Sequence, residues 1–253
     1  MPSTQKLEKL LPILNLKKVC KAIAVLDAII CQEWESRYYS YNSKWSKGEE
    51  CASMRNGSGD EYHILFNHYG SAINGFAHES EMSNWIEAKS EIEEKVVPKK
   101  FKEKVISFFT KDKPVERKEQ GYWTGIFDNL PSEFHEFIFG EPVKSIGTTF
   151  CIWRGYKDEN WQIGNIQFPD DDFKDGSSDL LELLDGDPQK YKDFAEDYFA
   201  DGSLTFASST IKKIYNGEVL TKVIVESINP DLEDWEQLLA DLDEIDYPHE
   251  IEV

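Results

Sequence analysis

Apolar residues recur every three or four positions from Leu16 to Tyr41. This spacing places side chains on one face of a helix. The positions that fit it are Leu16, Val19, Cys20, Ile23, Leu26, Ile30, Trp34, Tyr38 and Tyr41. The polar pair Asn42 and Ser43 then ends the apolar run. The sequence therefore predicts one long amphipathic helix near the N-terminus.

From Glu49 onward the pattern changes to short β-rich runs divided by glycine-containing turns. Residues 51–55, 61–66 and 71–76 form three such runs, and each is too short for a typical helix. Short runs joined by glycine turns are typical of antiparallel strands that follow one another along the chain. We expect a β-meander of three strands here.

The sequence of the middle of the chain predicts a helix followed by a domain boundary. Residues 80–97 are acidic with helical periodicity, and Pro98 would stop a helix there. Residues 99–120 are basic and end in a polar, proline-containing run. We therefore divide the chain into an N-terminal helix and β-meander (1–98), a basic connecting segment (99–120), and a hairpin with an acidic helical region (121–253). One continuous domain is the alternative.

The second half combines a hairpin with short helices. Residues 131–138 have the pattern of a short helix, and two β-rich runs follow at 148–153 and 161–168. Glycine, asparagine and proline then separate five short helical runs, at 178–184, 188–200, 206–215, 220–227 and 232–242. The expected fold class is α+β, with a long N-terminal helix, a meander plus hairpin, and a C-terminal cluster of short helices. The meander and hairpin either join in one antiparallel sheet or are split between two domains.

The amino-acid composition indicates that the chain folds around a hydrophobic core. Its 253 residues are 40% hydrophobic and 13% aromatic, which is too apolar for a disordered protein. The longest apolar stretch is interrupted by Lys17, Lys18, Lys21 and Asp27, so we expect no membrane span. It also lacks the cleavage pattern of a secretory signal. We expect a cytoplasmic protein whose scattered cysteines are buried thiols, at Cys20, Cys31, Cys51 and Cys151.

The charge of −20 is distributed unevenly. Residues 1–118 hold 19 basic and 17 acidic residues, a net charge of +2, whereas residues 119–253 hold 9 and 31, a net charge of −22. A basic run at 95–118, with nine basic residues and three acidic ones, is best explained by contact with the acidic half of the same chain. Because the acidic half would repel phosphates, we expect no nucleic-acid partner.

Four strings resemble a family of bacterial proteins to which no activity is assigned. They are Ser53-Met-Arg-Asn-Gly-Ser-Gly-Asp-Glu61, Gly75-Phe-Ala-His-Glu-Ser80, Thr148-Thr-Phe-Cys-Ile-Trp-Arg154 and Asp175-Gly-Ser-Ser-Asp-Leu-Leu181. The resemblance extends from about Trp45 to Pro248. It implies a bacterial cytoplasmic protein and supplies no catalytic residue.

The polar residues around the predicted meander form the candidate ligand site, made of Arg55, Asp60, His78 and Glu79. Glycine at 57 and 59 allows a close backbone approach to an anion, with Arg55 beside the turn. Imidazole and carboxylate groups also suit a metal ion, but no ligand motif such as HExxH or paired CxxC is present, so we predict no metal site. A plain hairpin loop is the competing interpretation.

Two hypotheses of function follow. The preferred one is a non-enzymatic interaction or regulatory protein, for example an immunity protein, that presents its acidic C-terminal surface to a basic protein partner. It rests on the charge of the C-terminal half and on the lack of a catalytic motif such as Gly-x-Ser-x-Gly. The alternative is an enzyme, or a domain that binds a small ligand or a metal, with its site at the meander. The sequence names no cofactor and no oligomeric state.

Overall fold

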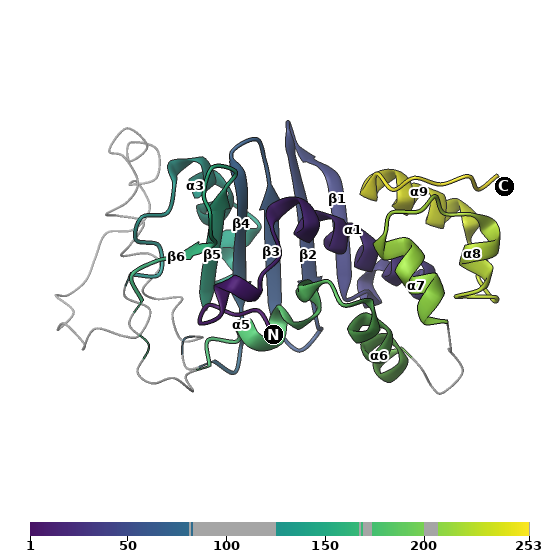
Figure 1. The fold of residues 1–253 in the computed structure, drawn as a ribbon, viewed down its shortest axis with the longest axis horizontal. Helices are drawn as coiled ribbons and strands as arrows, with labels where there is room; N and C mark the ends of the chain where they lie inside the picture. The colour runs from purple at the N-terminus through teal and green to yellow at the C-terminus, as the bar shows by residue number, and fades with distance from the viewer. Residues whose placement is uncertain (81, 83–124, 167, 169–173, 200–206, 253) are drawn as a thin grey trace, which may run out of the picture.

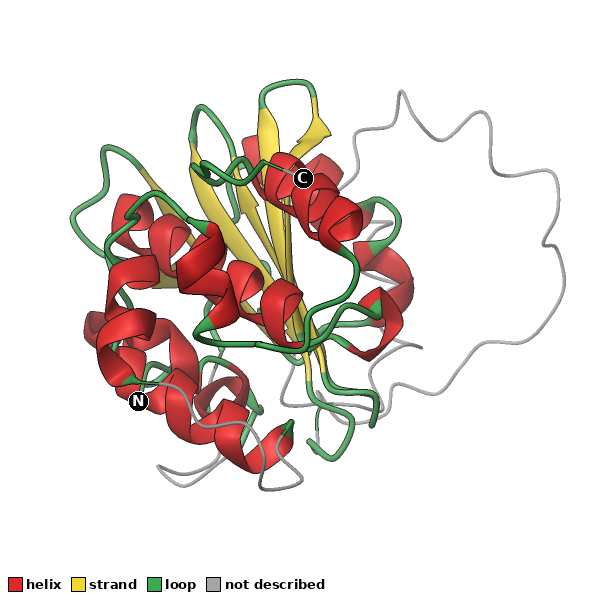
Figure 2. Cartoon of the chain, turned by 90° about the vertical axis from the view of Figure 1, so that its right-hand side faces the viewer, coloured by secondary structure: helices red, strands yellow, loops and turns green. Residues whose placement is uncertain are grey.

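The structure is a computed structural model, and it describes residues 1–80, 82, 125–166, 168, 174–199 and 207–252 (Figure 1). Its centre is one antiparallel sheet of six strands in the order β1-β2-β3-β4-β5-β6. The strands are β1 (Tyr39–Ser46), β2 (Glu49–Arg55), β3 (Glu61–Phe66), β4 (Gly70–Phe76), β5 (Phe150–Gly155) and β6 (Gln162–Ile163). Together with the helices on both of its faces (Figure 2), this sheet confirms the α+β class.

The meander and the hairpin belong to the same sheet, because β4 pairs with β5 from Gly70↔Gly155 to Gly75↔Phe150. Two details of the strand prediction were wrong. The meander has four strands, since β1 precedes the three expected ones. The last strand, β6, covers only two residues of the predicted 161–168 run.

The N-terminal helix is shorter than the sequence predicted. Helix α1 (Ile13–Ile30) ends at Ile30, and a 3-10 turn (Trp34–Ser36) leads into β1. Tyr39 and Tyr41 alternate into the core as strand residues do, with 6% and 3% of their surfaces exposed. The prediction was wrong here because aromatic residues at 38 and 41 also fit helical spacing.

Short helices cover the two faces of the sheet. On one face lie α1 and the C-terminal cluster, which follows the predicted runs: α5 (Ser177–Leu180), the 3-10 helix η6 (Glu182–Asp185), α6 (Pro188–Tyr198), α7 (Ser208–Tyr215), α8 (Lys222–Glu226) and α9 (Trp235–Ile245). On the other face lie η5 (Ser132–Phe134), α3 (His135–Phe139) and α4 (Val143–Ile146). A short 3-10 turn, η1 (Leu7–Lys9), precedes α1. In the described ranges, no helix combines the length and apolarity that crossing a bilayer requires.

The sheet separates two hydrophobic clusters because its side chains alternate between the faces. The larger cluster joins α1 and the C-terminal helices to strand residues such as Tyr62 and Ile64. The smaller one places Leu65 and Trp153 against Phe134. Cys20, Cys51 and Cys151 are buried as expected, whereas Cys31 is partly exposed. Nearly all of the predicted helix at 80–97, and the whole basic segment at 99–120, lie outside the described residues.

Gly75 of β4 is required by the close packing of the sheet on Phe150 of β5. A Cβ at position 75 would overlap the Phe150 ring, which is fully buried and has no room to move. We expect Gly75→Ala to lower the free energy of unfolding by about 1–3 kcal/mol, measured by urea denaturation. In a Phe150→Leu background the ring atoms are absent, so Gly75→Ala should lower the free energy of unfolding by less. Equal costs in both backgrounds would contradict this explanation.

Candidate functional site

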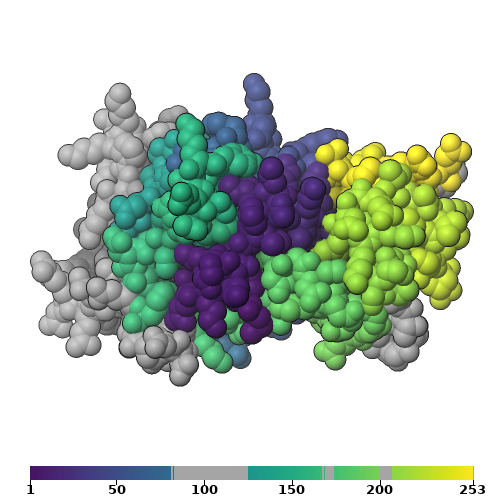
Figure 3. Space-filling model, in the orientation of Figure 1, coloured from purple at the N-terminus to yellow at the C-terminus, as the bar shows by residue number. Residues whose placement is uncertain are grey.

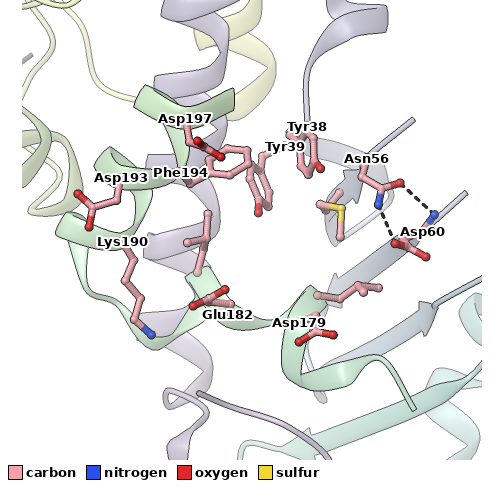
Figure 4. A pocket seen from close by; sticks show the side chains of 13 residues that line it. Tyr38, Tyr39, Asn56, Asp60, Asp179, Glu182, Lys190, Asp193, Phe194 and Asp197 are labelled. Atoms are coloured by element: carbon pink, nitrogen blue, oxygen red, sulfur yellow. Dashed lines mark hydrogen bonds between the residues drawn. The ribbon is translucent and has the colours of Figure 1, made fainter. Parts of the chain in front are cut away.

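A groove of about 520 Å³ lies on the α6 side of the sheet and is the candidate binding site (Figure 4). Helix α6 forms one side, the turn between β2 and β3 lies opposite, and the α5–η6 segment and the start of β1 complete it. The lining residues are Tyr38, Tyr39, Met54, Asn56, Asp60, Asp179, Leu180, Glu182, Leu183, Lys190, Asp193, Phe194 and Asp197. The groove therefore joins residues of the two sequence halves.

The groove has an aromatic wall. Tyr38 meets Phe194 edge to face at 5.0 Å between ring centroids, and it meets Tyr198 at 4.6 Å. Phe194 and Tyr198 are one helical turn apart on α6 and stack with their planes 9° apart. Tyr38 and Phe194 line the groove and are half-buried, whereas Tyr198 is 48% exposed and is not one of the lining residues.

Five carboxylates line the groove, from Asp60, Asp179, Glu182, Asp193 and Asp197. Among the described lining residues, one ammonium group is present, that of Lys190, and its Nζ is bound to Asp185 Oδ2 at 2.6 Å. Glu182 and Asp197 are exposed, and in the part of the chain that the structure describes no group donates a hydrogen bond to either carboxylate. The groove therefore carries a negative charge that its own residues do not balance.

The β2–β3 turn fixes Asp60 at the rim of the groove. Asn56 Nδ2 donates to Asp60 Oδ2 at 2.7 Å, and the backbone N–H of His78 donates to Asp60 Oδ1 at 2.8 Å. Partial burial works against ionisation of Asp60, but the hydrogen bonds from His78 and Asn56 outweigh it and hold the pKa of Asp60 below its usual range. Asp60 therefore stays ionised near neutral pH.

A fully buried carboxylate, Asp27 of α1, connects the two walls of the groove. Its Oδ2 accepts the backbone N–H groups of Tyr38 and Tyr39, at 3.0 and 2.8 Å. Its Oδ1 accepts the hydroxyl of Tyr191 on α6 at 2.6 Å. Burial raises the pKa of Asp27 to about 7, although these hydrogen bonds oppose the rise. Asp27 therefore positions the start of β1 against α6, the helix that carries Asp193 and Asp197.

The structure brings three of the four predicted site residues together. His78 Nδ1 lies 2.7 Å from Asp60 Oδ1, and its Nε2 lies 3.8 Å from Glu79 Oε1. Arg55 turns away from them: its guanidinium stacks on the Trp34 ring at 3.9 Å and donates to the Trp34 carbonyl. Of the four residues, Asp60 is the one that lines the groove.

The polar neighbours of the His78 ring are acidic side chains. Both ring nitrogens of His78 face carboxylates, and no serine, threonine or cysteine of the described chain is hydrogen-bonded to that ring. A nucleophile and its base must lie within hydrogen-bond reach of each other. Among the described residues, no three histidine, cysteine, aspartate or glutamate side chains are grouped so that they would hold a metal ion.

Sequence reasoning missed the residues of α6 that form the groove. Phe194 and Tyr198 fit the apolar periodicity of a core helix, and Asp193 and Asp197 fit a solvated face. One signal was available in the sequence. An acid directly followed by an aromatic residue occurs twice, at 193–194 and again four residues later at 197–198. Such a repeat places an acidic stripe beside an aromatic stripe on one helix.

We compared the chain with protein-family models, with curated proteins and with solved structures, and found no match in any of the three.

Proposed function

We propose that this protein binds a basic protein partner through the acidic groove and the C-terminal helices around it. The role is non-enzymatic and regulatory, of the kind that an immunity protein performs on a toxin. The observation that carries the proposal is the charge of the groove, where five carboxylates face one ammonium group that is already paired. A partner with exposed lysine or arginine residues would balance this charge.

The charge of the surface around the groove also supports a basic partner. The C-terminal helices form one continuous side of the molecule (Figure 3), and residues 174–199 and 207–252 hold 20 acidic and 6 basic residues, a net charge of −14. Acidic side chains beyond the groove are also exposed there, including Glu226, Asp231 and Glu233. Complementary fields of this kind accelerate association and disfavour partners of like charge.

The test is to isolate the tagged protein from the cells that produce it, at low ionic strength, and to record its native mass spectrum. We expect a second protein at fixed stoichiometry, with a basic isoelectric point. The dissociation constant of the reconstituted complex should then rise steeply with salt, because the interaction is screened beyond about 8–10 Å at 0.10–0.15 M salt. An acidic partner, or an affinity that does not change with salt, would contradict the proposal.

A further inference from the structure

We infer that the groove receives one arginine side chain of the partner, with the guanidinium against the aromatic wall and between the carboxylates of α6 and η6. This inference rests on the proposed function and specifies which group of the partner is recognised. It depends on three features that occur together: a cavity, an aromatic surface on one side of it, and two carboxylates, of Glu182 and Asp197, that accept no hydrogen bond from any described residue.

The aromatic wall is shaped for a flat cation. Tyr38 and Phe194 line the groove and pack edge to face, and Tyr198 packs against both of them from the last turn of α6. Asp193 and Asp197 are one helical turn apart and are exposed on the same helix. A cation within about 6 Å of such rings is attracted by their negative faces. A nearby carboxylate adds a charge-assisted hydrogen bond.

The available carboxylates surround this wall. Figure 4 shows Asp193 and Asp197 on α6 and Glu182 on the segment that faces it. Asp193 accepts one hydrogen bond, from Gln189 of its own helix, and Asp60 is engaged by Asn56 and His78. Glu182 and Asp197 therefore have the most capacity left to accept hydrogen bonds from a ligand.

Arginine fits this groove better than lysine. A guanidinium is planar, stacks on aromatic rings and offers five donors, whereas an ammonium is a compact and strongly hydrated charge. The same protein already uses this contact internally, where Arg55 stacks on Trp34 at 3.9 Å and donates to its carbonyl at 2.8 Å. The volume of about 520 Å³ lies within the range of sites that enclose a small ligand, about 300–1,000 Å³.

The test is a titration of the ¹⁵N-labelled full chain with Nα-acetyl-arginine amide, followed by NMR. Nα-acetyl-citrulline amide is the matched control, because citrulline has the shape of arginine without its charge. We expect the arginine probe to shift the amide signals of Phe194, Glu182 and Asp60, and to bind roughly tenfold more tightly than the citrulline probe. Equal binding of the two probes, or no shift at the groove, would overturn the inference.

Variants of the groove residues test whether the arginine probe binds in the groove. Phe194→Ala removes part of the wall, and the pair Glu182→Gln with Asp197→Asn removes two charges without changing the shape of the groove. Both should weaken binding of the arginine probe by roughly threefold to tenfold. The pair Glu133→Gln with Glu136→Gln removes the same charge from exposed residues on the opposite face of the sheet and should leave binding unchanged. An unaltered amide spectrum verifies that each variant is folded, and equal weakening by both pairs would overturn the inference.

Failure of this inference differs from failure of the proposed function. If the groove pair weakens the complex with the natural partner while the arginine probe does not bind, the function stands and the occupant is a different basic group. If the arginine probe binds but the natural partner is acidic or insensitive to salt, the function fails and the groove is a separate arginine site.

Discussion

Asp27→Ala should lower the free energy of unfolding by about 3–5 kcal/mol, because it leaves three buried donors without an acceptor. The donors are the backbone N–H groups of Tyr38 and Tyr39 and the hydroxyl of Tyr191. Asp27→Asn keeps one oxygen for the backbone groups and an amide that can donate to the tyrosine oxygen. We expect it to cost about 1–2 kcal/mol at pH 5. Urea denaturation of the three proteins measures both differences.

The same residue predicts a pH dependence. The pKa of Asp27 is about 7 in the folded protein and near 4 in the unfolded chain, so between these values the folded state holds a proton that the unfolded state has released. The stability that this group contributes is therefore fully present below about pH 4 and is lost as the pH rises through about 7. The free energy of unfolding of the wild type, relative to that of Asp27→Asn, should fall by roughly 2–4 kcal/mol over that range, so that the advantage of the wild type disappears or reverses near pH 7. A difference that is constant with pH would contradict the assignment.

Arg37→Met should lower the free energy of unfolding by about 3–5 kcal/mol, because it leaves the buried Asp241 carboxylate without its cation. Arg37 Nη2 lies 2.6 Å from Asp241 Oδ2, and only 4% and 8% of the two side chains are exposed. Arg37 also donates to the carbonyls of Cys31 and Gln32. It therefore ties the end of α1 to α9.

A double-mutant cycle measures the interaction energy between Arg37 and Asp241 apart from their contacts with other residues. Replacing both partners, as Arg37→Met with Asp241→Leu, removes the unpaired charge and should recover at least about 2 kcal/mol of the loss. The partly exposed pair Lys192–Glu196 on α6 is the control, and Lys192→Met should change stability by less than about 1 kcal/mol. If the losses of Arg37→Met and Asp241→Leu simply add, the buried pair does not stabilise the fold as described.

Most of the fold could be predicted from local patterns. The strands β2, β3 and β4 and the helices after Pro188 follow from short periodic runs between glycines and prolines, which are local signals. The end of α1 could not be predicted in this way. Tyr38 and Tyr41 continue the helical spacing, and the chain leaves the helix because Asp27 binds the backbone N–H groups of Tyr38 and Tyr39. That contact exists only in the folded protein.

The candidate site was predicted less well than the fold. Asp60, His78 and Glu79 were grouped because they lie around one predicted β-meander, and they do lie together. The groove, however, is completed by Glu182, Asp193 and Asp197, more than 100 residues away along the chain. Only the packing of α6 beside the start of β1 brings these carboxylates next to Tyr38. No local sequence pattern indicates that residues so far apart along the chain come together in the folded protein.

The most direct test of the central claim is to compare two charge-matched variants in binding to the natural partner. The groove variant carries Glu182→Gln, Asp193→Asn and Asp197→Asn. The control carries Glu133→Gln, Glu136→Gln and Glu159→Gln, which removes the same charge from exposed residues outside the groove and outside the C-terminal helices. We predict that the groove variant weakens the complex at least about tenfold more than the control in calorimetry at low salt. Equal weakening by the two variants, or none by the groove variant, would contradict the groove as the binding site.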